Sequence, residues 1–111
     1  MSDSKEEFVK FLRVLADQTR LDILDLLRDE NKTSTEIQAA LDKVQSTISQ
    51  HLKTLTDKNL IIFDKINNVK SYKIKNPNIY KLLAEIKDFV TRINQEKLKD
   101  LRDLDVIDTL L

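Results

Sequence analysis

Residues 44–55 have the sequence "VQSTISQHLKTL", and the two sides of this stretch differ in chemistry. Ile48, Leu52 and Leu55 follow at spacings of four and three, which places them on one face of a helix. The opposite face carries short or amide side chains, where a solvated helix usually carries Lys and Glu. The spacing predicts a helix over about 45–57 whose polar face contacts a partner. That face consists of Gln45, Ser46, Thr47, Ser49 and Gln50.

A second short helix is predicted just before this one, over residues 35–41, with Ile37, Ala40 and Leu41 facing inward. Hydroxyls from Thr33 to Thr35 can cap it, and residues 42–43 ("DK") form a tight turn. Two short helices joined by a tight turn, the second with a polar outer face, are typical of a helix-turn-helix.

A β-hairpin is predicted after the helix-turn-helix. The runs "LIIFDKI" (60–66) and "VKSYKIK" (69–75) are rich in strand-forming residues and flank the pair Asn67-Asn68. Asn is the residue other than Gly that most readily adopts positive φ, so this pair suits a tight hairpin turn.

Three further helical segments flank these elements. Residues 5–16 have an apolar stripe, with Ser4 as the expected cap and Glu7 as its capping-box partner. Asp17 is expected to cap a helix over 18–29. Asn76 and Pro77 are expected to start a long helix. We expect one domain over 1–97 and an amphipathic tail over 98–111 that continues the helix or frays.

The flanking helices carry more apolar side chains than a small helix-turn-helix core can cover. Burying each large apolar side chain contributes roughly 1.5–3 kcal/mol, so their exposure on a monomer is unfavourable. The sequence therefore predicts a homodimer, the alternative being that the tail folds back over them. The expected interface residues are Phe8, Phe11, Leu12, Leu82, Ile86, Phe89, Val90 and Ile93.

The composition excludes several kinds of site. The 111 residues include no Cys and no Gly, and His51 is the only His. Thiolate metal sites, glycine-rich phosphate loops and multi-histidine sites are therefore absent from one chain. We predict no enzyme activity, no metal and no cofactor. His51 itself fits two interpretations, a packed or capping side chain and a phosphate contact. No run of about 18 apolar residues and no signal peptide is present, so we expect a cytoplasmic protein.

Charge is distributed unevenly along the chain. The net charge is zero, but residues 32–75 hold eight lysines against four acidic residues. A phosphate backbone responds to the local field, and Gln, Ser and Thr can hydrogen-bond base edges in the major groove. We therefore predict double-stranded DNA as the partner, with a protein-binding module as the alternative. The predicted DNA-binding residues are Gln45, Ser46, Thr47, Ser49, Gln50, Lys53, Lys65, Lys70 and Lys73.

Three segments together resemble the ArsR/SmtB winged-helix repressors, and the resemblance covers about residues 8–93. They are "VLADQTRLDILDLL" (14–27), "STEIQAAL" (34–41) and "QSTISQHLKTLTDKNLI" (45–61), followed by the hairpin. The resemblance implies a mainly α fold with a small β-hairpin (α+β), a winged helix-turn-helix that dimerises through its first and last helices. It also implies a transcriptional repressor that binds an inverted repeat, with Lys65 and Lys70 in the wing.

The chain departs from this family at several positions. It has Gln18 where proline is usual and Asn67-Asn68 where the wing usually has Gly. The family's thiolate site would fall at Thr33 and Thr35, which cannot bind a soft metal, and residues 78–100 contain no His for its other metal site. Sensing of metals, arsenite or thiol oxidation is therefore not expected, and the effector stays open.

Overall fold

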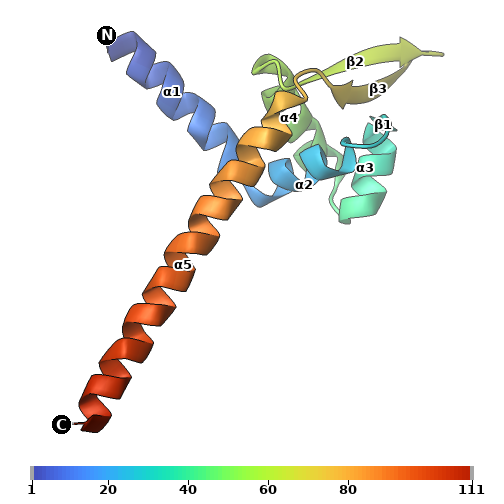
Figure 1. The fold of residues 1–111 in the computed structure, drawn as a ribbon. Helices are drawn as coiled ribbons and strands as arrows, with labels where there is room; N and C mark the ends of the chain where they lie inside the picture. The colour runs from blue at the N-terminus through green and yellow to red at the C-terminus, as the bar shows by residue number, and fades with distance from the viewer. Residues whose placement is uncertain (1, 111) are drawn as a thin grey trace. The chain divides into compact units, whose positions relative to one another are not determined.

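The fold is known from a computed structural model, which describes the backbone of residues 2–110 and the side chains of residues 3–104. It comprises two compact units, one ending at Pro77 and the other beginning at Asn78. The elements are α1 (Ser2–Leu15), α2 (Gln18–Leu26), β1 (Lys32–Thr33), α3 (Ser34–Leu41), α4 (Gln45–Asp57), β2 (Ile61–Ile66), β3 (Val69–Ile74) and α5 (Asn78–Leu110) (Figure 1).

The core of the first unit is built around α4. Ile48 and Leu55 are fully buried and Leu52 is 1% exposed, so the predicted apolar face of this helix is confirmed. These side chains share the core with fully buried residues of α2 and α3 and with Leu60 and Ile61 at the start of β2; the helical residues are Ile23, Leu24 and Ile37. Each such burial contributes roughly 1.5–3 kcal/mol, and together they fix which side of α4 faces outward.

The helix-turn-helix consists of α3, a short turn and α4. Asp42 ends α3 in the left-handed conformation, with φ 53°, and α4 begins at Gln45. Asp and Asn tolerate positive φ better than other non-Gly residues, which suits this turn in a chain without Gly. One expectation was wrong: Ala40 is exposed rather than inward, because it lies in the last turn of this short helix, beyond the fully buried Ile37.

The sheet has three antiparallel strands in the order β1-β3-β2. The hairpin of β2 and β3 has the predicted turn, with Asn67 at φ 52° and Asn68 at φ 64°. Positive φ at both central residues matches the right-handed twist of the flanking strands. The sequence did not reveal β1, whose two residues pair with β3 at Tyr72 and Ser71.

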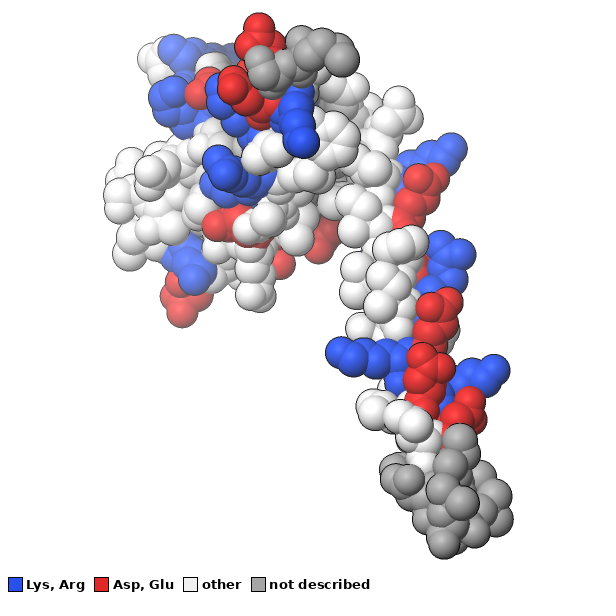
Figure 2. Space-filling view, turned by 90° about the vertical axis from the view of Figure 1, so that its left-hand side faces the viewer, with Lys and Arg blue, Asp and Glu red and all other residues white. Residues whose placement is uncertain are grey.

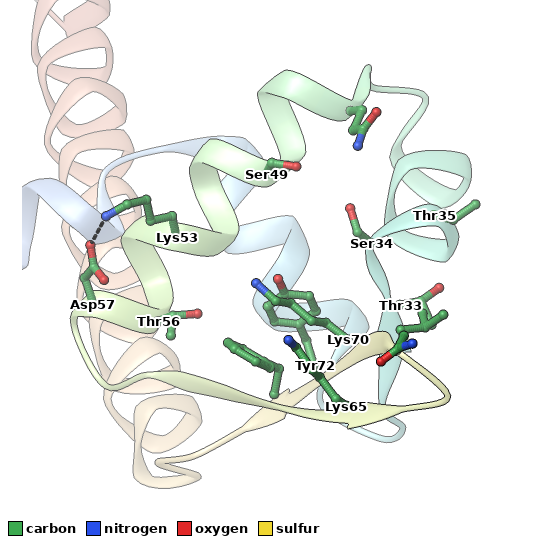
Figure 3. A pocket seen from close by; sticks show the side chains of 14 residues that line it. Thr33, Ser34, Thr35, Ser49, Lys53, Thr56, Asp57, Lys65, Lys70 and Tyr72 are labelled. Atoms are coloured by element: carbon green, nitrogen blue, oxygen red, sulfur yellow. Dashed lines mark hydrogen bonds and ion pairs between the residues drawn. The ribbon is translucent and has the colours of Figure 1, made fainter.

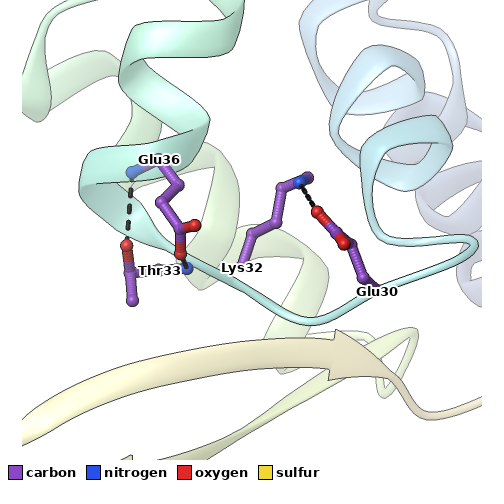
Figure 4. Close-up of polar contacts among 4 residues, drawn as sticks. All are labelled: Glu30, Lys32, Thr33 and Glu36. Atoms are coloured by element: carbon purple, nitrogen blue, oxygen red, sulfur yellow. Dashed lines mark hydrogen bonds and ion pairs between the residues drawn. The ribbon is translucent and has the colours of Figure 1, made fainter.

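A capping box starts α3 (Figure 4). The Glu36 amide donates to the Thr33 hydroxyl at 3.2 Å, and the Thr33 amide donates to the Glu36 carboxylate at 2.9 Å. The hydrogen bond from the Thr33 amide is the main reason that the pKa of Glu36 is lowered. Beside it, the Lys32 ammonium contacts the Glu30 carboxylate, which raises the pKa of Lys32.

Two of the predicted helix starts were wrong. Helix α1 begins at Ser2, so Ser4 lies inside it rather than capping it. Asn76 does not start α5, because its side-chain amide donates to the Asn59 carbonyl at 3.1 Å and so ties the end of the hairpin to its beginning. Asp17 is the N-cap of α2 as predicted, but α2 ends at Leu26, earlier than residue 29.

Helix α5 is continuous from Asn78 to Leu110, so the tail continues the helix. Uncharged side chains follow one side of it and charged side chains the other (Figure 2). The exposed apolar residues run on past residue 97 as Leu98, Leu101 and Leu104, and Ile107 and the final two leucines lie outside the described side chains. Among the described residues, no helix has the length and apolar character needed to cross a membrane.

The capping box predicts a stability difference between two neighbouring threonines. Thr33→Ala removes the hydroxyl that accepts from Glu36 and should lower the free energy of unfolding by about 1 kcal/mol. Thr35→Ala is the matched control, since Thr35 is exposed on the first turn and forms no part of the cap. Urea unfolding followed by circular dichroism measures both. Equal losses in the two variants would contradict a stabilising role for the capping box.

Candidate nucleic-acid interface

The outer face of α4 is a row of short polar side chains. Gln45, Ser46, Ser49, Gln50 and Lys53 are exposed, as the sequence predicts for a contact surface, and Thr47 is half-buried. They project outward because the apolar face of the same helix is held in the core. Val44, just before the helix, is 66% exposed and makes no side-chain cap. An aliphatic residue at this position contributes less to helix stability than a capping Ser, Thr, Asp or Asn would.

A groove of about 760 Å³ lies between α4, the start of α3 and the hairpin (Figure 3). Ser49, Lys53 and Thr56 line it from α4, while Lys65 and Lys70 extend into it from the hairpin. The groove thus combines hydroxyls with ammonium groups, which are donors suited to phosphate oxygens. Several residues that line the groove were not among the DNA-binding residues predicted from the sequence. They are Thr33, Ser34, Thr35, Thr56, Asp57, Phe63, Asn68, Val69 and Tyr72.

Two lysines face each other across the hairpin. Lys65 and Lys70 are direct register partners, and both line the groove. Like charges opposite one another on one sheet face destabilise the pair, so this arrangement favours a bound anion. The Lys70 ammonium lies 4.5 Å from the centre of the Phe63 ring, whose attraction for a cation offsets part of the repulsion.

Tyr72 packs against Phe63 on the face of the hairpin that carries Lys65 and Lys70. Its ring lies 5.5 Å from that of Phe63, centre to centre, and the two residues are register partners. Burial raises the pKa of the Tyr72 hydroxyl, so it stays protonated at neutral pH and can donate a hydrogen bond. Tyr72 is buried and Phe63 half-buried, and this tilted pair of rings lies on the same face of the hairpin as Lys65 and Lys70.

Two other predicted DNA-contacting lysines already form ion pairs. Lys53 reaches Asp57 at 2.9 Å on the groove side of α4. Lys73 reaches Asp64 at 3.0 Å. Because side chains alternate along a strand, Lys73 lies on the face of the hairpin opposite to Lys70. The structure thus brings Lys53, Lys65 and Lys70 together at the groove and places Lys73 apart from them.

Helix α4 is tied to α1 and α2 by the side chain of Arg20. Its Nε donates to the Val14 carbonyl at 2.7 Å and its second terminal nitrogen to the Arg13 carbonyl at 3.2 Å, at the end of α1. The remaining terminal nitrogen lies 3.4 Å from Nδ1 of His51 on α4. Of the two interpretations of His51, this contact favours a packed side chain. Sequence reasoning missed Arg20.

Asp17 completes this network. Its carboxylate accepts from the Arg20 amide at 3.0 Å as the N-cap of α2. That backbone hydrogen bond lowers the pKa of Asp17, with smaller contributions from the charges of His51 and Arg20. One carboxylate and one guanidinium thus join the end of α1, the start of α2 and the middle of α4.

The residues predicted for dimerisation are largely open to solvent within each unit. On α1, Phe8 is 64% and Leu12 is 47% exposed, whereas Phe11 is half-buried. On α5, all five predicted residues are exposed: Leu82, Ile86, Phe89, Val90 and Ile93. Because α5 is one continuous helix, its tail does not fold back over these five. The exposed apolar surfaces thus stay available to a partner.

Comparison with known proteins places these features among transcriptional regulators. Residues 17–62 match the family described as bacterial regulatory protein, arsR family. The arsenical resistance operon repressor of Staphylococcus xylosus is 30% identical over 106 residues, covering 96% of this chain and 85% of that protein. The solved structure of the transcriptional regulator HlyU from Vibrio vulnificus is 29% identical, with a TM-score of 0.62, covering 78% of this chain and 93% of that one.

A further solved structure shares the fold at lower identity. The homodimeric winged helix-turn-helix DNA-binding domain Mb0332 from Mycobacterium bovis, described as a possible ArsR-family regulator, is 21% identical with a TM-score of 0.72. The match covers 86% of this chain and 88% of that domain. The winged helix-turn-helix architecture expected from the sequence is therefore confirmed.

The Asp17 network predicts a pH dependence of stability. A carboxylate whose pKa is lower in the folded protein stabilises it above the unfolded value, about 4, and this contribution is lost as the pH falls through the folded pKa. Asp17→Asn keeps the cap but removes the charge. The difference in free energy of unfolding between wild type and Asp17→Asn should therefore become smaller below about pH 4. Asp29→Asn, at an exposed residue, is the control. A gap that stays constant in acid urea titrations would show that the charge contributes nothing.

Proposed function

We propose that this chain, which belongs to the arsR family of bacterial regulatory proteins, is a homodimeric repressor that binds an inverted repeat in double-stranded DNA. Membership of the family makes it a transcriptional regulator and not an enzyme. Sequence-specific DNA binding, the inverted repeat and the dimer are the parts that we infer, and we place the protein in the cytoplasm, where its DNA target lies.

The observation that carries the proposal is the polar row of α4 beside the lysine-lined groove. The major groove of B-DNA is about 12 Å wide and admits a helix whose exposed side chains are short. Ser46, Ser49 and Gln50 meet that condition. With α4 in the major groove, the groove beneath it would receive the adjacent phosphate backbone, which Lys65 and Lys70 neutralise.

Each side chain of the row suits a particular contact. An amide such as that of Gln50 or Gln45 can pair with N6 and N7 of adenine through two hydrogen bonds. Ser and Thr hydroxyls serve several bases, and the methyl groups of Val44 suit a thymine methyl. Lys53 would exchange its Asp57 partner for a phosphate. That exchange costs little, because an exposed ion pair of this kind is worth well under about 1 kcal/mol.

Dimerisation follows from the apolar surfaces of α1 and α5. Eight large apolar side chains along α5 are at least 41% exposed: Leu82, Ile86, Phe89, Val90, Ile93, Leu98, Leu101 and Leu104. A continuous apolar stripe of this length marks an interface in a soluble protein. A two-fold dimer presents two copies of α4, and its symmetry requires a DNA site with the same two-fold repeat.

The signal that controls this regulator is not a soft metal bound by thiolates. The Staphylococcus xylosus relative is an arsenical resistance repressor, but this chain has no Cys with which to bind arsenite in that way. Among the side chains of residues 3–104, no cluster of three or more His, Asp or Glu is arranged to hold a metal ion. We therefore propose a DNA-binding regulator that does not sense metals.

Selection of bound duplexes from a random pool tests the proposal directly. We expect an inverted repeat whose half-sites are centred about one helical turn, or a multiple of it, apart. Sedimentation of the complex should give two chains per duplex. Recovery of no sequence preference, together with a monomeric protein, would overturn the proposed function.

The amide of Gln50 is predicted to contribute to sequence preference. Gln50→Ala should relax the selected sequence at one position per half-site and cost roughly 1–3 kcal/mol of discrimination there. Gln18→Ala, at an exposed Gln on α2, should leave the selected site unchanged. If both variants select the wild-type site with equal stringency, Gln50 does not contact a base.

The groove-facing lysines are predicted to contact phosphates. Lys70→Ala should weaken binding to all duplexes alike and reduce the slope of log affinity against log salt by about one. Lys73→Ala is the matched control, because Lys73 lies on the same strand but on the opposite face and is paired with Asp64. Equal slope changes in both variants would extend the interface to the outer face of the hairpin, as the sequence alone predicted.

A further inference from the structure

Tyr72 presents a hydroxyl without a partner to the groove between α4, the start of α3 and the hairpin. Its side chain is only 8% exposed and lines that groove. Among the described residues, no side chain hydrogen-bonds to this hydroxyl, and no fully buried side-chain oxygen lacks a partner. The hydroxyl therefore opens on the groove. There it can donate a hydrogen bond to an acceptor that enters.

The ammonium group of Lys70 is held close to this part of the groove. It lies 4.5 Å from the centre of the Phe63 ring, which itself lies 5.5 Å from the ring of Tyr72. Lys70 thus leans back from its own rung of the hairpin toward the rung of the two aromatic residues. Its register partner Lys65 lines the same groove. Two ammonium groups and one hydroxyl donor therefore come from neighbouring rungs on one face of the hairpin.

Hydroxyl groups enter the groove from the two helices. Ser34 at the start of α3 and Ser49 of α4 both extend into it (Figure 3). The Ser34 oxygen accepts from the side-chain amide of Gln38 at 3.0 Å, which leaves its own proton free to donate. Asp57 brings a negative charge to the lining, and it is paired with Lys53 at 2.9 Å. The groove as a whole therefore offers hydrogen-bond donors and an excess of positive charge.

We propose that this groove is an effector site for a small phosphate monoester with a hydroxyl-bearing body, and that binding of this ligand displaces DNA. The inference rests on the proposed function and adds a signal to it. Lys65, Lys70 and the Tyr72 hydroxyl would hold the phosphate, because charge-assisted hydrogen bonds to phosphate oxygens are strong. Ser34 and Ser49 would contact the hydroxyls of the body. Sugar phosphates and nucleoside monophosphates both have this chemistry.

The size of the groove favours a small molecule over a bare ion. Its volume is about 760 Å³, which lies within the range of roughly 300–1,000 Å³ that is usual for small-molecule sites. An inorganic phosphate would leave most of this space empty and would not reach the serines of the helices. The body of the ligand is therefore expected to contribute to its affinity.

The charge of the lysine pair favours a monoester over the diester of a DNA backbone. Each backbone phosphate carries one negative charge, whereas a monoester carries roughly 1.5–2 at neutral pH. Two opposed lysines match the higher charge better. The proposed DNA complex uses the same two lysines, so DNA and the ligand exclude one another. Release of DNA on ligand binding would provide a signal that needs no thiolate, in a chain without Cys.

Calorimetric titration of the full chain without DNA tests the site by itself. The probes are glucose 6-phosphate and adenosine monophosphate, each compared with inorganic phosphate and with its unphosphorylated parent. We expect at least one ester to bind roughly tenfold or more tightly than inorganic phosphate and than its parent. The ester that binds distinguishes a sugar phosphate from a nucleotide as the source of the ligand.

Two variants locate the bound ester. Tyr72→Phe keeps the ring but removes the hydroxyl, and it should weaken binding roughly tenfold, because a hydrogen bond to a charged group is lost. Lys70→Ala should weaken it at least as much. The matched controls are Tyr80→Phe on α5 and Lys73→Ala on the other face of the hairpin, and both should bind the ester as wild type does. Thermal unfolding checks that all four variants fold.

The titrations can overturn the inference in three ways. Saturable binding of neither ester would exclude the site. Equal affinities for the ester and inorganic phosphate would reduce it to a general anion site. Equal affinities of wild type, Tyr72→Phe and Lys70→Ala would place the ester elsewhere on the chain.

Competition with the duplex recovered from selection tests the regulatory part. The ester that binds should displace labelled DNA over the concentration range in which it fills the groove, whereas its unphosphorylated parent should not. A duplex that stays bound when the groove is saturated would overturn the exclusion of DNA by the ligand. If wild type binds the ester but no duplex, the proposed function fails and the ligand site stands on the titrations. If it binds the duplex but neither ester, this inference alone fails.

Discussion

Burial of Ile48, Leu52 and Leu55 is the constraint on which the rest of the structure depends. These three side chains hold α4 against α2, α3 and the start of β2. Because a helix is rigid, fixing one face also fixes the direction of the other. The polar row from Gln45 to Lys53 therefore points outward, with all of its members exposed except the half-buried Thr47. Arg20 also helps to fix the orientation of α4, because its side chain joins His51 of α4 to the end of α1.

The hairpin carries two exposed cross-strand pairs next to its turn. Lys65 opposite Lys70 is a repulsive pair, and Ile66 opposite Val69 leaves aliphatic surface in water. The lysine pair is unfavourable in the free protein and would be relieved by a bound anion, whereas the aliphatic pair stabilises the hairpin across its two strands. The buried ring of Tyr72 and the positive φ of the two asparagines keep the hairpin tight around both pairs.

One difference in composition bears on the signal to which this regulator responds. The arsenical resistance repressor of Staphylococcus xylosus aligns with 96% of the chain, yet the chain has no Cys. The helix-turn-helix and the hairpin are thus present without any thiolate that could bind a soft metal. This combination is the basis of the proposal that the chain does not sense arsenite through cysteine.

The sequence by itself determined the helix-turn-helix, the hairpin and the polar face of α4. These depend on local rules: apolar spacing of three and four, cap residues, and the tolerance of Asn for positive φ. Only the tertiary structure showed that Lys53 of α4 lines the same groove as Lys65 and Lys70 of the hairpin, since these side chains come from elements that are separate in sequence. It also revealed β1, the Arg20 network and the Asn76 to Asn59 bond. These contacts join residues remote in sequence, which periodicity does not detect because it describes only neighbours along one element.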